Sequence, residues 1–367
     1  MAENRGGRFV NSTATSTTDV VSWCTSMVAG DFDQDLQPEW ITTGTQVPWM
    51  TEQRDGLLET FWFSPIILIE QFEQQAALFD MDLDGLVDML ISPSSRFDPT
   101  AEVGDDTHQE GLWVFRSTSE ANPGSRIEWL SESLDLEPPL PCFDEPNPAR
   151  AAALRYGAES FVVDDFDLDG DEDIFLPMPS TTCGLGPGWY DNRAQQGEVG
   201  FVFRPFQASY GALLRSTAGT AADLDRDGDL DIIMHNWGTG RIAVFENVLN
   251  ERRLSDVRPL RVAARTDPDG DATDPDTSDD RWARGLVIDF DLDGPNFDYS
   301  RDRIRSRVIG GGASHGTLGP PERIFGRPDS GPIWVRTRFA DGSITTLRVE
   351  EFEREVILVD CAEAECS

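Results

Sequence analysis

The sequence contains no lysine, so each of its 30 basic residues is an arginine. Its 67 acidic residues outnumber them and give a formal net charge of −37. Proteins that bind nucleic acid or anionic membranes need a basic patch, so this charge argues against both kinds of partner. Two explanations of the missing lysine stay open: a GC-rich genome, or an acidic surface adapted to salt.

Histidine is scarce as well, with 3 residues in the chain. None of His108, His235 and His315 falls in a metal-ligand spacing. The glycine-rich run 310–316 lacks the Gly-Lys-Ser/Thr ending of a phosphate-binding loop. We therefore expect no catalytic activity, with the reservation that a glycosidase needs only two suitably spaced carboxylates.

Long apolar runs are also missing. No stretch approaches the ~18 residues of a membrane-spanning helix, so we expect no direct membrane insertion. The 5 cysteines leave one over after pairing. Cys142 could pair with Cys183, and Cys361 with Cys366, whereas Cys24 lies in an apolar strand pattern that favours simple burial.

Aspartate, by contrast, is abundant and recurs in five segments with a spacing of two. These segments begin at Asp31, Asp80, Asp165, Asp223 and Asp289. Carboxylates this close repel one another unless a cation lies among them. Ca²⁺ is the natural cation, because it takes roughly six to eight oxygen ligands from a flexible loop. The recurrence indicates a chain built from repeated calcium-binding units.

The segments begin like an EF-hand loop but do not continue as one. An EF-hand needs a glutamate at position 12 and a helix on each side. Position 12 is instead occupied by Thr42, Ile91, Leu176, Met234 and Ser300. Flanking segments such as 161–163, 174–176 and 232–234 are short apolar runs bounded by turn residues, which favours strands. We therefore predict a shorter loop between two strands.

The predicted ligands are the side chains at positions 1, 3, 5 and 9 and the carbonyl at position 7. In the five copies they are Asp31, Asp33, Asp35, Gln37 and Glu39; Asp80, Asp82, Asp84, Leu86 and Asp88; Asp165, Asp167, Asp169, Asp171 and Asp173; Asp223, Asp225, Asp227, Asp229 and Asp231; and Asp289, Asp291 and Asp293. Glycine at position 6 permits the positive φ of a sharp turn, but Leu36 replaces it in the first copy. The fifth copy has Phe297 at position 9. We expect the middle three loops and the first to bind an ion, and the fifth to have altered or absent coordination.

The motif Asp-x-Asp-x-Asp-Gly-x-x-Asp between strands resembles the FG-GAP/VCBS repeat of integrin α-subunit β-propellers. The resemblance covers 76–92, 160–177 and 219–235, and is weaker over 27–43. The segment 300–308 resembles the opening of the ASPIC/UnbV domain, with Arg305 and Ser306 in place of Gly and Ala. The strand–turn–strand pattern 335–347 follows the order of the same domain. Repeats followed by this domain are the arrangement of the bacterial relatives of cartilage acidic protein.

This resemblance implies an all-β fold with two parts. Residues 1–258 would form a propeller of about five to seven blades, and 259–360 a small β domain that completes or caps the ring. The acidic insertion 267–280 would be a solvated loop, with or without a weakly held ion, and 361–367 a tail.

The function implied by this fold is binding, and fold analogy is its only support. We expect a calcium-binding adhesion, protein-interaction or assembly module with a protein or glycan partner at the cell surface or in a larger assembly. The alternative is a carbohydrate-binding or carbohydrate-active protein that uses a propeller face. Several loops of this kind imply about millimolar Ca²⁺, which places the protein outside the cytosol: extracellular (secreted), at the cell surface or periplasmic.

Overall fold

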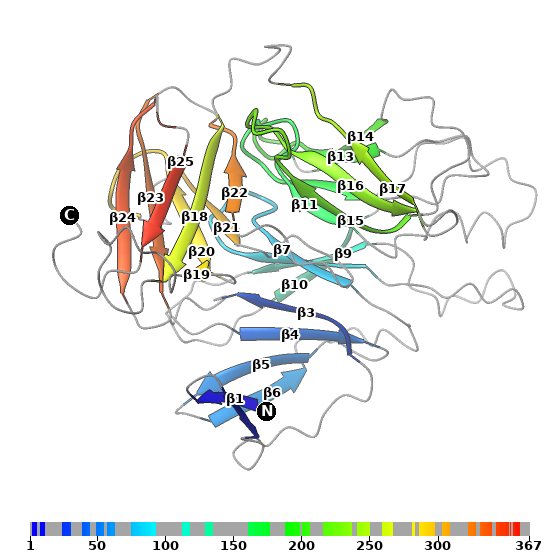
Figure 1. Ribbon diagram of the computed structural model, residues 1–367, viewed down its shortest axis with the longest axis vertical. Coiled ribbons are helices and arrows are strands. Elements are labelled where there is room, and N and C mark those ends of the chain that lie inside the picture. Colours follow the sequence, from blue (N-terminus) through cyan, green and yellow to red (C-terminus); the bar gives the residue numbers. More distant parts are fainter. Residues whose placement is uncertain are drawn as a thin grey trace, which may run out of the picture.

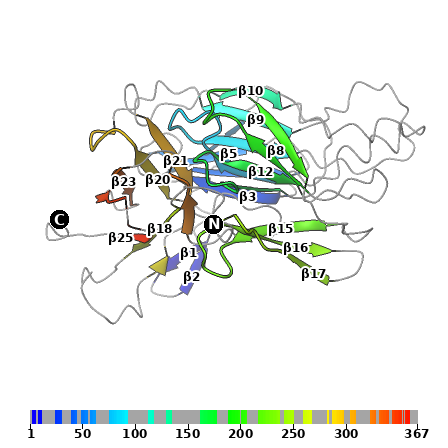
Figure 2. The same ribbon diagram turned by 90° about the horizontal axis from the view of Figure 1, so that it is seen from above.

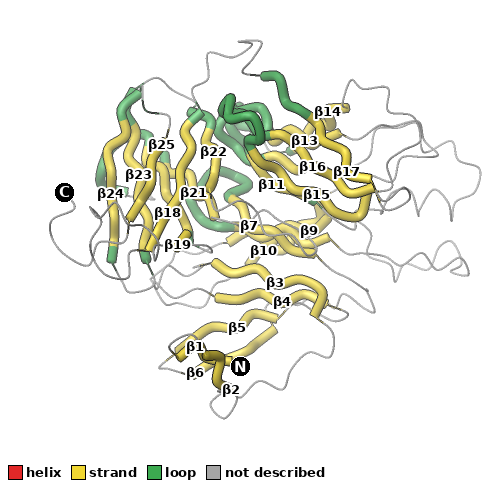
Figure 3. Tube along the Cα trace, in the orientation of Figure 1, coloured by secondary structure: helices red, strands yellow, loops and turns green. Residues whose placement is uncertain are grey.

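The computed structural model describes residues 2–5, 8–11, 24–30, 39–44, 49–54, 57–62, 75–92, 112–117, 129–134, 161–176, 188–198, 200–205, 216–236, 241–249, 259–266, 281–282, 286–297, 303–308, 322–327, 331–339, 343–351, 353 and 355–359. Every regular element in these ranges is a strand (Figure 3), so the expected all-β fold is confirmed. No described helix has the length and hydrophobicity of a membrane span.

Four sheets are antiparallel meanders that follow one another along the chain. Sheet 1 contains β3 (Cys24–Gly30), β4 (Glu39–Gly44), β5 (Trp49–Arg54) and β6 (Leu57–Trp62). Sheet 2 contains β7 (Gln75–Phe79), β8 (Asp88–Ser92), β9 (Leu112–Ser117) and β10 (Trp129–Leu134). Sheet 3 contains β11 (Val162–Asp164), β12 (Asp173–Leu176), β13 (Gly188–Asn192) and β14 (Phe201–Pro205). The described strands of sheet 4 are β15 (Ser216–Ala222), β16 (Asp231–Asn236) and β17 (Arg241–Phe245).

Each aspartate loop of sheets 2, 3 and 4 connects the first strand of its sheet to the second. The loops run from 80 to 87, from 165 to 172 and from 223 to 230, and a strand flanks each loop on both sides. The strand–loop–strand unit predicted from the sequence is therefore confirmed for these three copies. The first strands β3, β7, β11 and β15 also contact one another in succession.

The four sheets stack through side chains on both faces of their strands. In β7, Ala76 and Leu78 pack toward sheet 1, whereas Ala77 and Phe79 pack toward sheet 3. Side chains alternate between the faces of a strand, so a strand covered on both faces reads as a continuous apolar run. This explains the short apolar runs beside the loops. No sheet of described strands closes on itself.

The C-terminal strands form two further sheets that pack on each other, to the left in Figure 1. One sheet contains β19 (Arg281–Trp282), β18 (Leu260–Thr266) and β22 (Glu322–Phe325), with β25 (Glu355–Val359) paired to β18. The other contains β21 (Ile304–Val308), β20 (Val287–Asp291), β23 (Ile333–Arg338) and β24 (Ile344–Val349). The rings of Phe290 and Phe325 stack between the sheets with centroids 4.2 Å apart. We call this unit the C-terminal sandwich.

The view from above places the sandwich against the meanders (Figure 2). A separate two-stranded sheet joins β1 (Ala2–Arg5) to β2 (Arg8–Asn11). The predicted domain boundary at 258/259 falls between β17 and β18. Several predictions lie outside the described residues: the loop 31–38, the acidic insertion 267–280, the tail 361–367, and the pairing of Cys142, Cys183, Cys361 and Cys366.

The sandwich core provides a first test of this packing. We expect Phe290→Ala to lower the free energy of unfolding by about 3–5 kcal/mol, because it removes a stacked ring and leaves a cavity. Ile344→Ala, at a side chain that is 56% exposed, should change it by less than about 1 kcal/mol. Denaturant unfolding of both variants measures the difference. Equal losses would contradict this packing.

Candidate metal sites

The three described aspartate loops share one backbone conformation. Position 4 has a left-handed φ of 60° in Leu83, 61° in Leu168 and 65° in Arg226. Position 6 is a glycine with positive φ in each loop: 84° in Gly85, 101° in Gly170 and 97° in Gly228. Non-glycine residues adopt positive φ at a cost, so its recurrence at position 4 shows that the loop conformation is imposed by its surroundings. The glycine predicted for a sharp turn has that role in all three copies.

Two hydrogen bonds recur in each loop. The position-1 carboxylate accepts the N–H of the glycine at position 6 at 3.2 Å, and the position-9 carboxylate accepts the N–H of residue 2 at 3.0 Å. These bonds use the Oδ2 atom at position 1. The Oδ1 atoms of Asp80, Asp165 and Asp223 are buried and have no hydrogen-bond partner. A buried carboxylate oxygen without a partner is costly, and in all three loops this oxygen is in a position to serve as a metal ligand.

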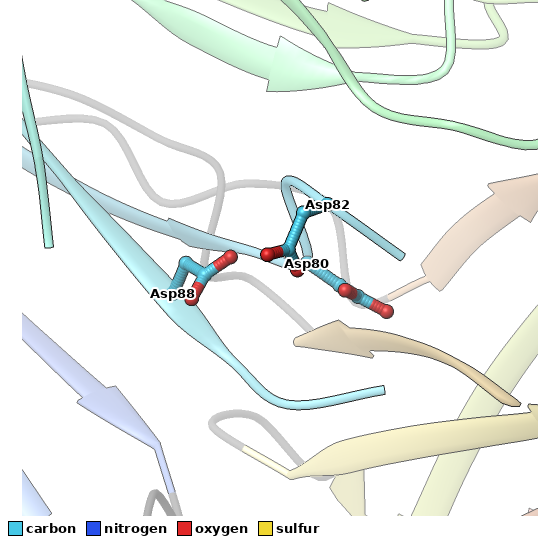
Figure 4. A group of neighbouring side chains, drawn as sticks. All are labelled: Asp80, Asp82 and Asp88. Carbon is cyan, nitrogen blue, oxygen red and sulfur yellow. The ribbon is translucent and has the colours of Figure 1, made fainter. Parts of the chain in front are cut away.

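In each loop three carboxylates converge, with ligand atoms within 4.8 Å of one another. The groups are Asp80, Asp82 and Asp88, shown in Figure 4; Asp165, Asp167 and Asp173; and Asp223, Asp225 and Asp227. Each group could hold a metal ion. Some predicted ligands lie outside these groups. They are the position-5 side chains of the second and third copies, the position-7 carbonyls of all three copies, and Asp231. Their part in coordination stays a prediction.

The fifth segment has a different structure from the middle three. Asp289 and Asp291 lie in strand β20, and only Asp293 lies in the loop that follows. Asp289 accepts two hydrogen bonds from Arg336, at 2.7 and 3.2 Å, and Asp293 pairs with Arg303 at 3.1 Å. Among the described residues these three aspartates do not converge on one point. Of the first segment, only Glu39 is described, and it is 2% exposed at the start of β4.

Burial makes the loop carboxylates hard to ionise without a cation. It raises the pKa of Asp80, Asp165 and Asp173 well above the usual range, and neighbouring loop aspartates add to the effect. Burial and the charge of Asp82 raise the pKa of Asp84 to about 6. For Asp171, burial and the charge of Asp169 raise the pKa to about 8. A bound divalent cation would favour the charged form and reverse these shifts.

The C-terminal sandwich supplies donors to the position-1 carboxylate of every described loop. The N–H of Ser306 donates to Asp80 at 3.0 Å, and the N–H of Gly326 donates to Asp165 at 2.8 Å. The guanidinium of Arg261 pairs with the fourth-copy carboxylate, Asp223. The candidate metal sites therefore lie where the meanders meet the sandwich.

Strand β21 contacts two of the loops through three consecutive side chains. Arg305 donates to the carbonyl of Leu83 at 2.9 Å, and the Ser306 hydroxyl donates to the carbonyl of Gly85 at 2.7 Å. The next residue, Arg307, donates to the carbonyl of Gly170 at 2.8 Å. Arg305 and Ser306 thus bind the loop that begins at Asp80, and Arg307 binds the loop that begins at Asp165. The sequence alone did not indicate these roles.

Glu172 forms the centre of a buried charge network that sequence reasoning missed. Its carboxylate pairs with Arg307 at 3.4 Å and with Arg323 at 3.3 Å, and it accepts the N–H of Asp80 at 3.3 Å. Arg323 also pairs with Asp164 at 2.6 Å. Removing one partner of such a buried pair typically lowers the free energy of unfolding by about 3–5 kcal/mol, because the other charge is left uncompensated. The network thus joins the loops of sheets 2 and 3 to the C-terminal sandwich.

Two asparagines join consecutive loops, and sequence reasoning missed them too. The N–H of Asn192 donates to Asp173 at 2.8 Å, while its side chain donates to the carbonyl of Met81 in the preceding loop at 3.0 Å. Asn247 repeats this arrangement, with its N–H on Asp231 at 2.8 Å and its side chain on the carbonyl of residue 166 at 3.0 Å. The shared signal in the sequence is an acidic residue followed by asparagine at or just past the end of the third strand of the sheet.

Comparison with known proteins identifies no family for this chain. No family model and no curated protein matches it. A solved structure of an Agrocybe aegerita lectin, described as recognising non-reducing terminal N-acetylglucosamine, matches with 14% identity and a TM-score of 0.35. The match covers 96% of this chain and 84% of the lectin chain. At that TM-score the likeness carries no argument about fold or ligand.

The raised pKa values predict an inverted pH dependence for the calcium-free protein. A carboxyl group with a higher pKa in the folded chain binds more protons when folded, so stability falls as pH rises. The window runs from the ordinary aspartate value of about 4 to about 6 for Asp84 and about 8 for Asp171. We expect the melting temperature without calcium to rise as pH falls from about 8 to about 5.

Calcium should cancel this dependence, because its ligands must be deprotonated and its stabilising effect therefore grows with pH. Melting curves at several pH values, recorded with and without calcium, make the comparison. A calcium-free protein that is most stable at about pH 8 would contradict the prediction.

Proposed function

We propose that this chain is an extracellular, cell-surface or periplasmic calcium-binding β-propeller that acts as an adhesion, protein-interaction or assembly module. The observation that carries the calcium assignment is the recurrence, in three loops, of a buried position-1 carboxylate oxygen without a hydrogen-bond partner. Ca²⁺ suits these loops because all their converging ligand atoms are carboxylate oxygens. Mg²⁺ demands a stricter geometry and usually keeps several of its waters.

The propeller assignment is supported by the order and packing of the meanders. Each meander places its aspartate loop between its first and second strands, and the first strands of consecutive sheets contact one another. A ring of blades repeats this arrangement around a central axis. In the proposed ring the C-terminal sandwich occupies the place of further blades and caps the inner strands.

A binding role is supported by exposed apolar residues on the last described strand of sheet 4. On β17, Ile242 is 70% exposed and Val244 is 53% exposed, and both lie on the face turned away from the core. Adjacent exposed apolar side chains are typical of protein-binding surfaces. Trp189, by contrast, packs edge-on against Phe166 at 6.3 Å, which is a core contact. These observations favour a protein partner over a sugar. We also propose that the chain has no catalytic turnover.

Calcium should contribute directly to folding stability, since a ligand that binds only the native state stabilises it by mass action. We expect excess chelator to lower the melting temperature by several degrees. Asp165→Asn should remove part of the calcium-dependent shift. The matched control is Asp293→Asn, which changes an exposed aspartate that pairs with Arg303 and should leave the shift intact. A melting curve unaffected by excess chelator would refute the calcium assignment.

The class of partner can be tested on cell surfaces. We expect the calcium-loaded chain to bind cell-surface material whose glycans have been removed enzymatically. Binding should disappear when that material is treated with protease or when chelator is added. Loss of binding after deglycosylation, with proteolysis having no effect, would contradict a protein partner and favour the carbohydrate alternative. Incubating the same preparation with polysaccharides and esters tests the absence of turnover.

A further inference from the structure

One structural position distinguishes the three candidate metal loops. The strand registers pair Met89 with Phe115, Ile174 with Tyr190 and Ile232 with Phe245. The next residue along the third strand is therefore equivalent in the three sheets. It is Arg116 in sheet 2, Asp191 in sheet 3 and Glu246 in sheet 4. Its charge thus changes from positive to negative between neighbouring copies of one unit.

In sheet 2 this position supplies a positive charge to the loop. Arg116 donates to the position-3 carboxylate of Asp82 at 3.1 Å. One divalent ion would not neutralise all the loop aspartates. The guanidinium of Arg116 offsets part of the negative charge that would remain. In sheet 4, Glu246 is exposed and lies outside the converging carboxylates of its loop.

In sheet 3 the same position adds a negative charge. Asp191 is 2% exposed, and its ligand atom lies within 4.8 Å of those of Asp167 and Asp169. Asp167 also belongs to the group formed with Asp165 and Asp173. Two converging groups of carboxylates in one sheet therefore share Asp167.

The two arginines beside Asp191 leave one of its oxygens unused. Arg204 donates to Oδ2 of Asp191 at 2.8 and 2.6 Å, and Arg193 donates to the same atom at 3.2 Å. The Oδ1 atom is buried and has no hydrogen-bond partner. Asp171, in the adjacent loop, also has a buried Oδ1 atom without a partner. If arginine pairing were the whole role of Asp191, its second oxygen would not be buried unpaired.

We propose that sheet 3 holds a second divalent cation, coordinated by Asp167, Asp169 and Asp191, with Asp167 bridging it to the ion of the loop. This inference rests on the proposed binding of Ca²⁺ by the loops. The site takes a hard cation, because its protein ligands are carboxylate oxygens. Three carboxylates are fewer than the roughly six to eight oxygens that Ca²⁺ accepts, so water or an oxygen of a bound partner completes the coordination.

The number of ions bound by the full chain tests the proposal. We expect Asp191→Asn to bind one calcium ion fewer per chain than the parent protein, as counted by elemental analysis after equilibration with calcium. Glu246→Gln changes the equivalent, exposed position of sheet 4 and should leave the count unchanged. Asp191→Arg copies the arrangement of sheet 2, where Arg116 supplies a positive charge to the loop, so it should also bind one ion fewer.

The outcomes separate this proposal from the one on which it rests. A parent protein that binds no calcium would refute the proposed function. A parent protein that binds several ions, with the same count in Asp191→Asn, would refute the second site alone. If both Asp191 variants fail to fold, anomalous scattering from crystals of the parent protein with calcium decides. Two peaks at the sheet 3 loop, one of them beside Asp191, support the proposal, and a single peak overturns it.

Discussion

The burial of loop carboxylates is the constraint on which the rest of this structure depends. Asp80 and Asp165 are fully buried, and each uses one oxygen to accept N–H groups from its own loop and from the C-terminal sandwich. Burying an ionised carboxylate is tolerable only when charge and hydrogen bonds compensate it. The meanders and the sandwich therefore pack together where that compensation is available, and the proposed cations would compensate the unpaired oxygens.

Buried carboxylates need a compensating positive charge, which arginine supplies at several places in this structure and which a metal ion would supply at the proposed sites. Arg307 and Arg323 neutralise Glu172 between the loops and the sandwich, and Arg116 does the same for Asp82 in sheet 2. Arginine suits these places because its planar group donates several hydrogen bonds and stays charged when buried. At the equivalent position of sheet 3, Asp191 pairs through one oxygen with Arg193 and Arg204, and the proposed second cation would bind its other oxygen. The absence of lysine from the whole chain is consistent with this use of arginine.

The stacked sheets explain why the loops are rigid enough to bury charge. The loops of sheets 2 and 3 adjoin strands that are covered on both faces by neighbouring sheets, as Ala77 and Leu78 illustrate in β7. Asn192 and Asn247, at or just past the ends of the third strands of sheets 3 and 4, then join the loop of each of these sheets to the preceding loop. A loop held at both ends and from the side loses little further conformational entropy when an ion binds, which favours affinity.

The sequence by itself determined the repeated loop, its glycine at position 6, the strands on either side and the apolar runs buried on both faces. Each of these follows from short-range spacing or from side-chain alternation along one strand. Only the tertiary structure decided which groups compensate the buried charge. Arg307 lies 137 positions from its partner Gly170, and Asn192 lies 111 positions from Met81. Spacing along the chain carries no information about such contacts, because they depend on how sheets pack. For the same reason, Asp289 and Asp291 match the loop pattern in sequence but lie in strand β20, where the register places Asp289 opposite Arg336.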